Sequence, residues 1–193
     1  MSEEKDSHLI LARFPTAEEA HAAGQHLKEW DKDYDGIDLG AMSILTLDEN
    51  GKLKEDKVGE RRARGGAKWG GLAGAALGIL SGGVTLIGGA IVGLAAGALG
   101  GSLFHQKIGM TDEDQAKLEQ HLKDGGAALA VMMDYDEIEG TLYELNSLGA
   151  EVATYNVPQE VLDDMQKMYR SEKVIHDRLE ADESVEMAGE EPD

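Results

Sequence analysis

Residues that commonly carry enzyme chemistry are sparse and scattered in this chain. It contains no cysteine, which excludes disulfides, iron–sulfur clusters, thiolate zinc sites and cysteine nucleophiles together. The sequence holds no G-x-G-x-x-G, no G-x-x-x-x-G-K-[ST] and no G-x-S-x-G motif. Its six histidines lie far apart along the chain, at His8, His21, His26, His105, His121 and His176. We therefore predict that the protein is not an enzyme and has neither catalytic residues nor a cofactor.

Two carboxylate–histidine pairs have the spacing of metal ligands on a helix. Glu18 precedes His21 by three residues, the spacing found in di-iron bundles, but those sites repeat the motif and add two glutamates. Here the motif occurs once, on a helix that must also cover a sheet. Glu172 and His176 are four apart, and they either share a surface ion or form a solvated face. We expect no metal site.

The distribution of charge argues against one class of partner and favours another. With 38 acidic and 18 basic side chains the net charge is −20, so nucleic acid is not an expected partner. Residues 52–68 are the exception, because they carry seven basic and three acidic side chains. This segment has a charge of +4 and the rest of the chain −24, so it alone is suited to anionic lipid head groups.

An uncharged run of 36 residues, 69–104, follows this basic segment directly. As one helix it would be roughly 54 Å long, well beyond a hydrocarbon core of about 30 Å. Ser81-Gly82-Gly83 and Gly88-Gly89 interrupt the run near its middle. We therefore predict a hairpin of two helical arms over 59–109, with the bend somewhere within 81–89.

Glycines recur every four residues in each predicted arm, which places them on one helix face. Such a stripe lets another backbone approach closely, as in GxxxG helices of membranes. A flexible linker is a weaker alternative, because linkers are polar and this run is aliphatic. The predicted helix-packing interface comprises Gly66, Gly70, Gly74, Gly78, Gly82, Gly89, Gly93, Gly97 and Gly101.

The ends of the run resemble the edges of a membrane segment. Trp69 and Phe104 would form an aromatic belt on one side, and basic residues lie just outside them. The positive-inside rule then places both termini in the cytoplasm. Leu, Ile, Val and Phe number 13 in the run and contribute only about −4 to −8 kcal/mol to insertion. The predicted membrane-flanking residues are Arg61, Arg62, Arg64, Lys68, Trp69, Phe104 and Lys107.

The remaining sequence predicts a small α+β unit. Strands are expected over 8–14, 39–47, 127–133 and 151–157, and residues 52–58 are a polar return that can pair back. Helices are expected after Thr16, after Thr111 with Asp114 as a capping box, and over 136–148. Without the insert and the helix attached to it, the order is β-α-β-β-α-β, which is ferredoxin-like.

The sequence divides into five segments. Residues 1–58 and 110–157 are the two halves of the ferredoxin-like domain, and 59–109 is the glycine-zipper hairpin between its second and third strands. We expect residues 158–180 to form an amphipathic helix that packs on the sheet or on another subunit, with Val161, Met165 and Met168 on its apolar stripe. We expect residues 181–193 to be a disordered acidic tail.

The glycine run, GGAKWGGLAGAALGILSGGVTLIGGAIVGLAAGALGG, and the following TDEDQAKLEQHLKDGGAALAV resemble a bacterial family of predicted membrane proteins, domain of unknown function 1269. The resemblance covers roughly residues 8–157 and excludes the extension from Gln159. Small domains of this shape also occur in general stress proteins. The family has no established catalytic residues, so the resemblance implies a stress or envelope role but no site chemistry.

Three functions are compatible with these features. The first is a non-enzymatic membrane-associated protein that forms homo-oligomers through the glycine hairpin and contacts membrane lipid. The second is a soluble, cytoplasmic, self-assembling structural protein whose hairpins form a buried oligomer core. The third, a small-ligand enzyme or sensor, is the weakest, because no motif specifies a ligand.

Overall fold

The computed structural model of the protein describes residues 7–33, 39–51, 53–58 and 104–163, with only the backbone at 104 and 105. The predicted hairpin with its bend, the basic flank, most of the last helix and the acidic tail lie outside the described residues.

The described strands and helices fall into two blocks, one before and one after residues 59–103. The first block comprises β1 (Ser7–Phe14), α1 (Ala17–Asp33), β2 (Met42–Leu47) and β3 (Leu53–Lys57). The second begins with α5 (Phe104–Lys107), α6 (Asp112–Lys123) and β4 (Ala127–Asp134). It continues with a 3-10 turn (Tyr135–Glu137), α7 (Ile138–Ser147) and β5 (Glu151–Val157), and residues 159–163 are again helical.

The five strands form one sheet in the order β3-β2-β4-β1-β5, and all neighbours are antiparallel. The α+β class is therefore confirmed, with a five-stranded antiparallel sheet and four helices among the described residues. The polar return after the Asp48–Gly51 turn is the fifth strand, β3, which pairs with β2. β1 lies between β4 and β5, so the first strand of the chain is an interior strand of the sheet.

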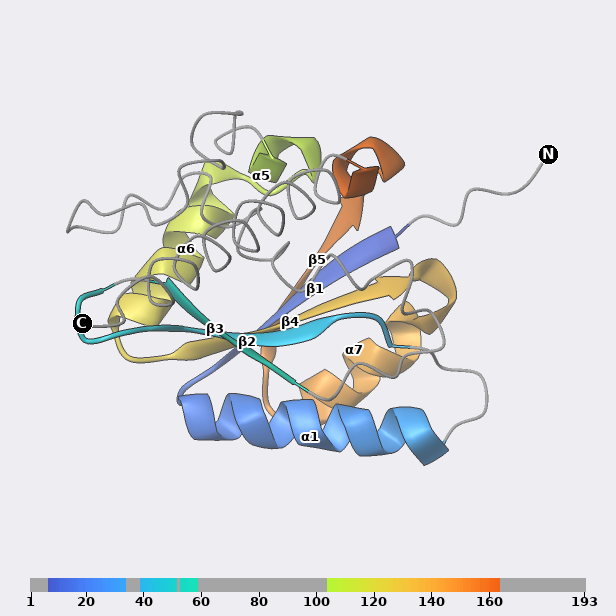
Figure 1. Cartoon of the computed structure of the whole chain (residues 1–193), viewed down its shortest axis with the longest axis horizontal. Helices are drawn as coiled ribbons and strands as arrows, with labels where there is room; N and C mark the ends of the chain where they lie inside the picture. The colour runs from blue at the N-terminus through green and yellow to red at the C-terminus, as the bar shows by residue number, and fades with distance from the viewer. Residues whose placement is uncertain (1–6, 34–38, 52, 59–103, 164–193) are drawn as a thin grey trace, which may run out of the picture.

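Helices cover both faces of the sheet, so the described part has three layers (Figure 1). On one face α1 and α7 pack over Ile10, Phe14 and Leu129. On the other, α6 and the turn at 159–163 pack over Leu9, Leu11 and Tyr155. Alternate residues of β1 therefore enter different clusters, because successive side chains of a strand point to opposite faces. Since both faces are buried, β1 and β4 are apolar nearly throughout.

Local sequence signals fix the element ends. The Thr16 hydroxyl accepts a hydrogen bond from the Glu19 amide at 3.2 Å at the start of α1, as expected for an N-cap. Thr111 and Asp114 form the predicted capping box of α6. Gly125 and Gly149, at φ +89° and +81°, follow the ends of α6 and α7, where the left-handed conformation favours glycine.

Two boundaries differ from the prediction. The strand predicted over 39–47 begins at Met42, although the Gly40 amide still donates to the Met132 carbonyl at 3.0 Å. The helix predicted over 136–148 starts as a 3-10 turn and becomes α-helical only at Ile138. The tighter turn brings the chain from the end of β4 into the helix without a separate loop.

Candidate functional site

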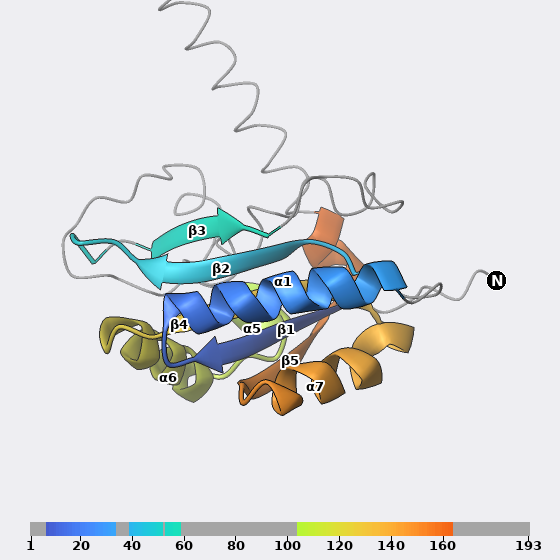
Figure 2. The same ribbon diagram turned by 90° about the horizontal axis from the view of Figure 1, so that it is seen from below.

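The strand registers bring several chain segments to one end of the sheet. Ser7 of β1 pairs with Asp134 of β4 and with Val157 of β5. β2 begins near the end of β4, and the Val58 amide, just after β3, donates to the Met42 carbonyl at 3.0 Å. In Figure 2, β3 accordingly points toward the side from which β1 and β2 start. We call this end of the sheet the insertion end, because Val58, the last described residue before the segment 59–103, lies there.

Val58 anchors the chain where it enters the inserted segment. Its side chain is 9 % exposed and belongs to the cluster under α1 and α7. Gly24 of α1 allows this contact, because a Cβ at Gly24 would lie only 3.1 Å from the Val58 methyl groups. The entry to the insert is thus fixed on the α1 face of the sheet.

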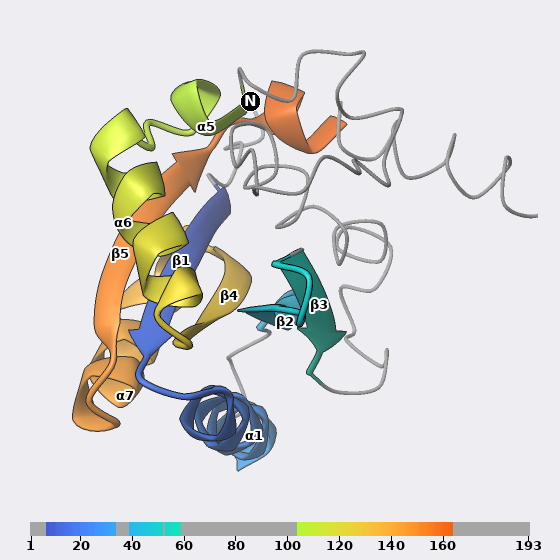
Figure 3. The same cartoon turned by 90° about the vertical axis from the view of Figure 1, so that its left-hand side faces the viewer.

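The chain returns from the insert on the opposite face. After α5, Ile108 and Met110 are buried in the cluster under α6, and Gly109 between them has φ +77°. Lys107 Nζ lies 3.2 Å from Glu160 Oε1, in the helical turn that follows β5. Figures 1 and 3 show α5 beside residues 159–163. Both ends of the insert therefore lie at the insertion end, on opposite faces.

Most residues of the predicted membrane and packing site lie outside the described residues. These are all nine stripe glycines, the three arginines, Lys68 and Trp69. Phe104 and Lys107 are the first and last residues of α5, so the structure places both at the insertion end. Within the described ranges, no helix has the length and hydropathy needed to cross a bilayer.

Tyr135 is an aromatic residue of the insertion end that sequence reasoning did not single out. It follows Asp134, the last residue of β4, and 68 % of its surface is exposed. Its ring lies 5.6 Å from the His8 ring, centroid to centroid. The available signal was its position just after the apolar run AALAVMM, from which only Asp134 separates it.

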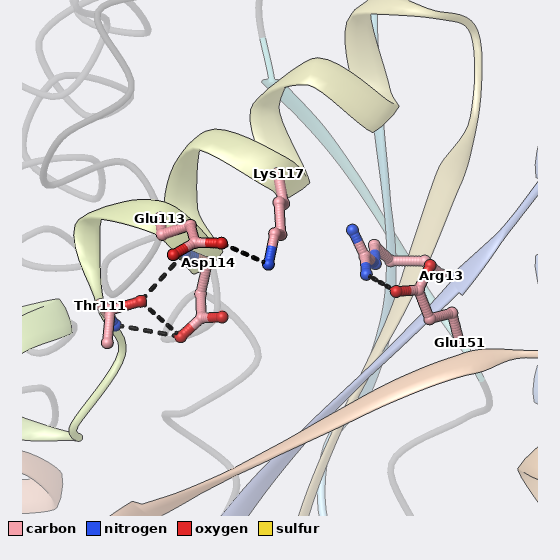
Figure 4. A network of polar contacts seen from close by, with 6 residues as sticks. All are labelled: Arg13, Thr111, Glu113, Asp114, Lys117 and Glu151. Carbon is pink, nitrogen blue, oxygen red and sulfur yellow. Dashed lines mark hydrogen bonds and ion pairs between the residues drawn. The ribbon is translucent and has the colours of Figure 1, made fainter.

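A small hollow with a mostly apolar surface lies between α6 and the strands β1 and β5, and Arg13, Asp114 and Lys117 are the charged residues of its lining (Figure 4). Arg13 forms an ion pair with Glu151, and Lys117 Nζ lies 2.7 Å from Glu113 Oε1. The cavity has a volume of about 30 Å³, which is enough for only one or two water molecules. Both cations are already paired, so the hollow offers no preformed anion site.

The pKa shifts of Tyr155 and Asp114, which line this hollow, indicate that both residues have a structural role. Burial raises the pKa of Tyr155 to about 12, so its phenol stays protonated at neutral pH. Hydrogen bonds from the Thr111 hydroxyl and then the Thr111 amide hold the pKa of Asp114 below its usual 3.8. Asp114 is therefore a carboxylate that caps α6, and neither group is suited to act as a base near pH 7.

The histidines of the described ranges make separate contacts. His21 Nε2 lies 4.0 Å from Asp56 Oδ2, and His26 Nε2 lies 2.8 Å from Glu144 Oε2. His121 Nε2 lies 2.8 Å from the Phe14 carbonyl, to which it donates from α6. Within the described residues, no three His, Asp or Glu side chains are grouped to hold a metal ion. The pair Glu172 and His176 lies outside those residues.

Comparison with known proteins supports the resemblance seen in the sequence. A family model described as "Protein of unknown function (DUF1269)" matches residues 63–186, which is more than half of the chain. The extent differs from the prediction, because the match begins close to the glycine run and includes the extension from Gln159. No curated protein and no solved structure matches the chain.

The capping box gives a prediction for the pH dependence of stability. Because the pKa of Asp114 is lowered in the folded state, its carboxylate stabilises the fold above the ordinary pKa, and this contribution disappears as the pH falls through the folded value. We expect Asp114→Asn to lower the free energy of unfolding at pH 7 by about 0.5 kcal/mol, a small value for an exposed cap. The difference should shrink as the pH falls below 3.8 and disappear once the folded-state carboxyl is protonated.

Urea unfolding of both proteins at several pH values measures this difference. Asp112→Asn is the control, because it removes a charge from the same helical turn and leaves the three Thr111–Asp114 hydrogen bonds intact. An equal loss in the two variants, or a loss that does not depend on pH, would contradict the assignment.

Proposed function

This chain belongs to the DUF1269 family, whose function is unknown, and we propose that it is a non-enzymatic, membrane-associated protein that forms homo-oligomers. The glycine-rich segment is the proposed contact with both lipid and other copies of the chain. The folded domain and both termini then face the cytoplasm. The family resemblance implies a stress or envelope role.

The proposed architecture is a ferredoxin-like sheet that carries a glycine-zipper hairpin. Four strands in the order β2-β4-β1-β5 contain two interlocked β-α-β units, through α1 and through α7, as that fold requires. β3 extends one edge, and the hairpin is inserted between β3 and α5. The helix α6 covers the face opposite α1 and α7.

The observation that supports membrane association best is the common position of the two ends of the insert. Val58 and α5 both lie at the insertion end, and the segment between them contains all but the last residue of the 36-residue uncharged run. A helical hairpin that enters and leaves a bilayer from one side needs its ends on that side. Tyr135, exposed at the same end, is a residue type enriched at membrane interfaces.

The charge pattern supports contact with anionic lipid through one segment only. Arg61, Arg62, Arg64 and Lys68 precede the apolar run in an otherwise acidic protein. Each cation near an anionic leaflet contributes about 1 kcal/mol, which is comparable with the modest insertion energy of the run. Electrostatic attraction and packing of several hairpins through their glycine faces would therefore act together.

A soluble self-assembling protein is the second candidate. The observation that favours it is the pairing of Lys107, one of the expected lipid-facing cations, with the protein's own Glu160. If the arginines of 61–64 pair with internal acids in the same way, the hairpins would form a buried oligomer core in water. The following two experiments separate the candidates.

The first experiment changes Arg61, Arg62 and Arg64 together to Gln. Binding to vesicles with anionic lipid should fall by at least tenfold, because three favourable contacts of about 1 kcal/mol each are lost. Binding to neutral vesicles should change little. The control is a triple change of Lys32, Lys117 and Lys123 to Gln, which removes the same charge from α1 and α6. The soluble candidate would be favoured if the triple change altered assembly in the absence of lipid. Any binding to vesicles would then not depend on their lipid composition.

The second experiment tests the glycine stripe. Gly74→Leu and Gly93→Leu should each lower the oligomeric state, since a side chain on the stripe separates the facing backbones. Light scattering in detergent and in its absence measures the size of the oligomer. Ala75→Leu adds similar volume next to the stripe and is the matched control. Unchanged oligomers in both glycine variants would show that these glycines lie outside an interface.

A further inference from the structure

The two edge strands of the sheet, β3 and β5, differ sharply in charge. An edge strand presents backbone N–H and C=O groups to which a further strand can pair, and charged side chains, above all lysine, oppose such pairing. In β3, LKEDK, four of the five residues are charged and two are lysines. In β5, EVATYNV, the one charged residue is Glu151, and it forms an ion pair with Arg13 of the neighbouring strand.

The outer side of β5 therefore favours strand pairing. Among the described residues, β5 pairs with β1 on its inner side and with no strand on its outer side. Thr154 and Asn156 are exposed, and both lie on the face of β5 that α7 covers, because side chains alternate along a strand. Charge does not protect this edge as it protects β3.

The helix next to this edge carries an exposed aromatic residue. α7 packs on β5, whereas α1 packs on β2 and β4, so α7 is the outer helix on their common face (Figure 3). Leu145 of α7 is buried against the sheet, and Glu144 Oε2 lies 2.8 Å from Nε2 of His26 in α1. Tyr143 takes part in neither contact, and 75 % of its surface is exposed.

We propose that β5 pairs antiparallel with β5 of a second copy of the chain, so that two sheets join into one. A two-fold axis perpendicular to the sheet keeps each face on the same side in both copies. The longest overlap pairs all seven residues of β5 and places Thr154 opposite Thr154 on the axis. Glu151 then lies opposite Val157, so the two Glu151 carboxylates are about 20 Å apart, where salt screens their repulsion.

A second copy fits this edge because the strand is complementary to itself. In the seven-residue register no charged side chain faces a like charge, which matters in a chain with a net charge of −20. The two α7 helices also come side by side across the axis, since each covers its own β5. Tyr143 then lies beside the partner helix, and tyrosine is a residue type enriched at protein interfaces.

This contact goes beyond the proposed function and does not rest on it. It uses the folded domain, whereas the proposed hairpin contact uses the glycine stripe. Because the axis is perpendicular to the sheet, both copies turn the face that carries α5 and α6 to the same side. The pair is therefore compatible with attachment of both copies to one membrane.

The absence of cysteine allows a test with single introduced thiols. Thr154→Cys places two cysteines opposite each other with Cα atoms about 4.5 to 5.5 Å apart, a distance that a disulfide bridges. Asn156→Cys is the matched control, because Asn156 is also exposed on the same face of the same strand. Its two copies would lie roughly 14 Å apart, too far for a disulfide.

The experiment is mild oxidation of the full chain in detergent, followed by electrophoresis without reductant. We expect Thr154→Cys to give at least about fivefold more covalent dimer than Asn156→Cys, because only its thiols are within bonding distance. A Thr154→Cys chain that stays monomeric, or equal dimer yields from the two variants, would overturn the inference. Either result would leave membrane association to the vesicle measurements, which do not depend on this contact.

Discussion

The pairing of β1 with β4 and β5 is the constraint on which the rest of the described structure depends. Ser7–Phe14 is paired along one edge with β4 and along the other with β5, and both strands follow the inserted segment in sequence. The sheet can close only when the chain on both sides of 59–103 has come together. The two ends of the insert are thereby fixed to one folded unit.

The antiparallel registers also make the two ends of the sheet different. The insertion end holds the entry to the insert at Val58 and its return at α5. The helices α6 and α7 precede β4 and β5 in the chain. The burial of Val161 and Leu162 shows that the extension after β5 begins as part of the domain, against the α6 face. The family match to residue 186 agrees with this, because it includes the extension together with the insert.

Strands, caps and turns were predictable because their signals are local. The apolar runs HLILARF and AALAVMM are strands buried on both faces, and the Thr111–Asp114 capping box forms as expected. The position of α6 was not predictable, since DEDQAKLEQHLK shows an apolar stripe but not the surface that buries it. The contact of Lys107 with Glu160 was also hidden, because residues so far apart in sequence meet only through the sheet. The proposed packing of the stripe glycines and the proposed lipid contact of the arginines rest on the sequence pattern alone.

Membrane attachment through the glycine segment is the central claim, and fractionation of cells that make the full chain tests it most directly. The protein should sediment with membranes through washes with high salt and alkaline carbonate, and detergent should release it as an oligomer. Salt and carbonate remove proteins held only by charge, so retention would report the apolar segment. A chain that is fully soluble and monodisperse without detergent would contradict membrane attachment.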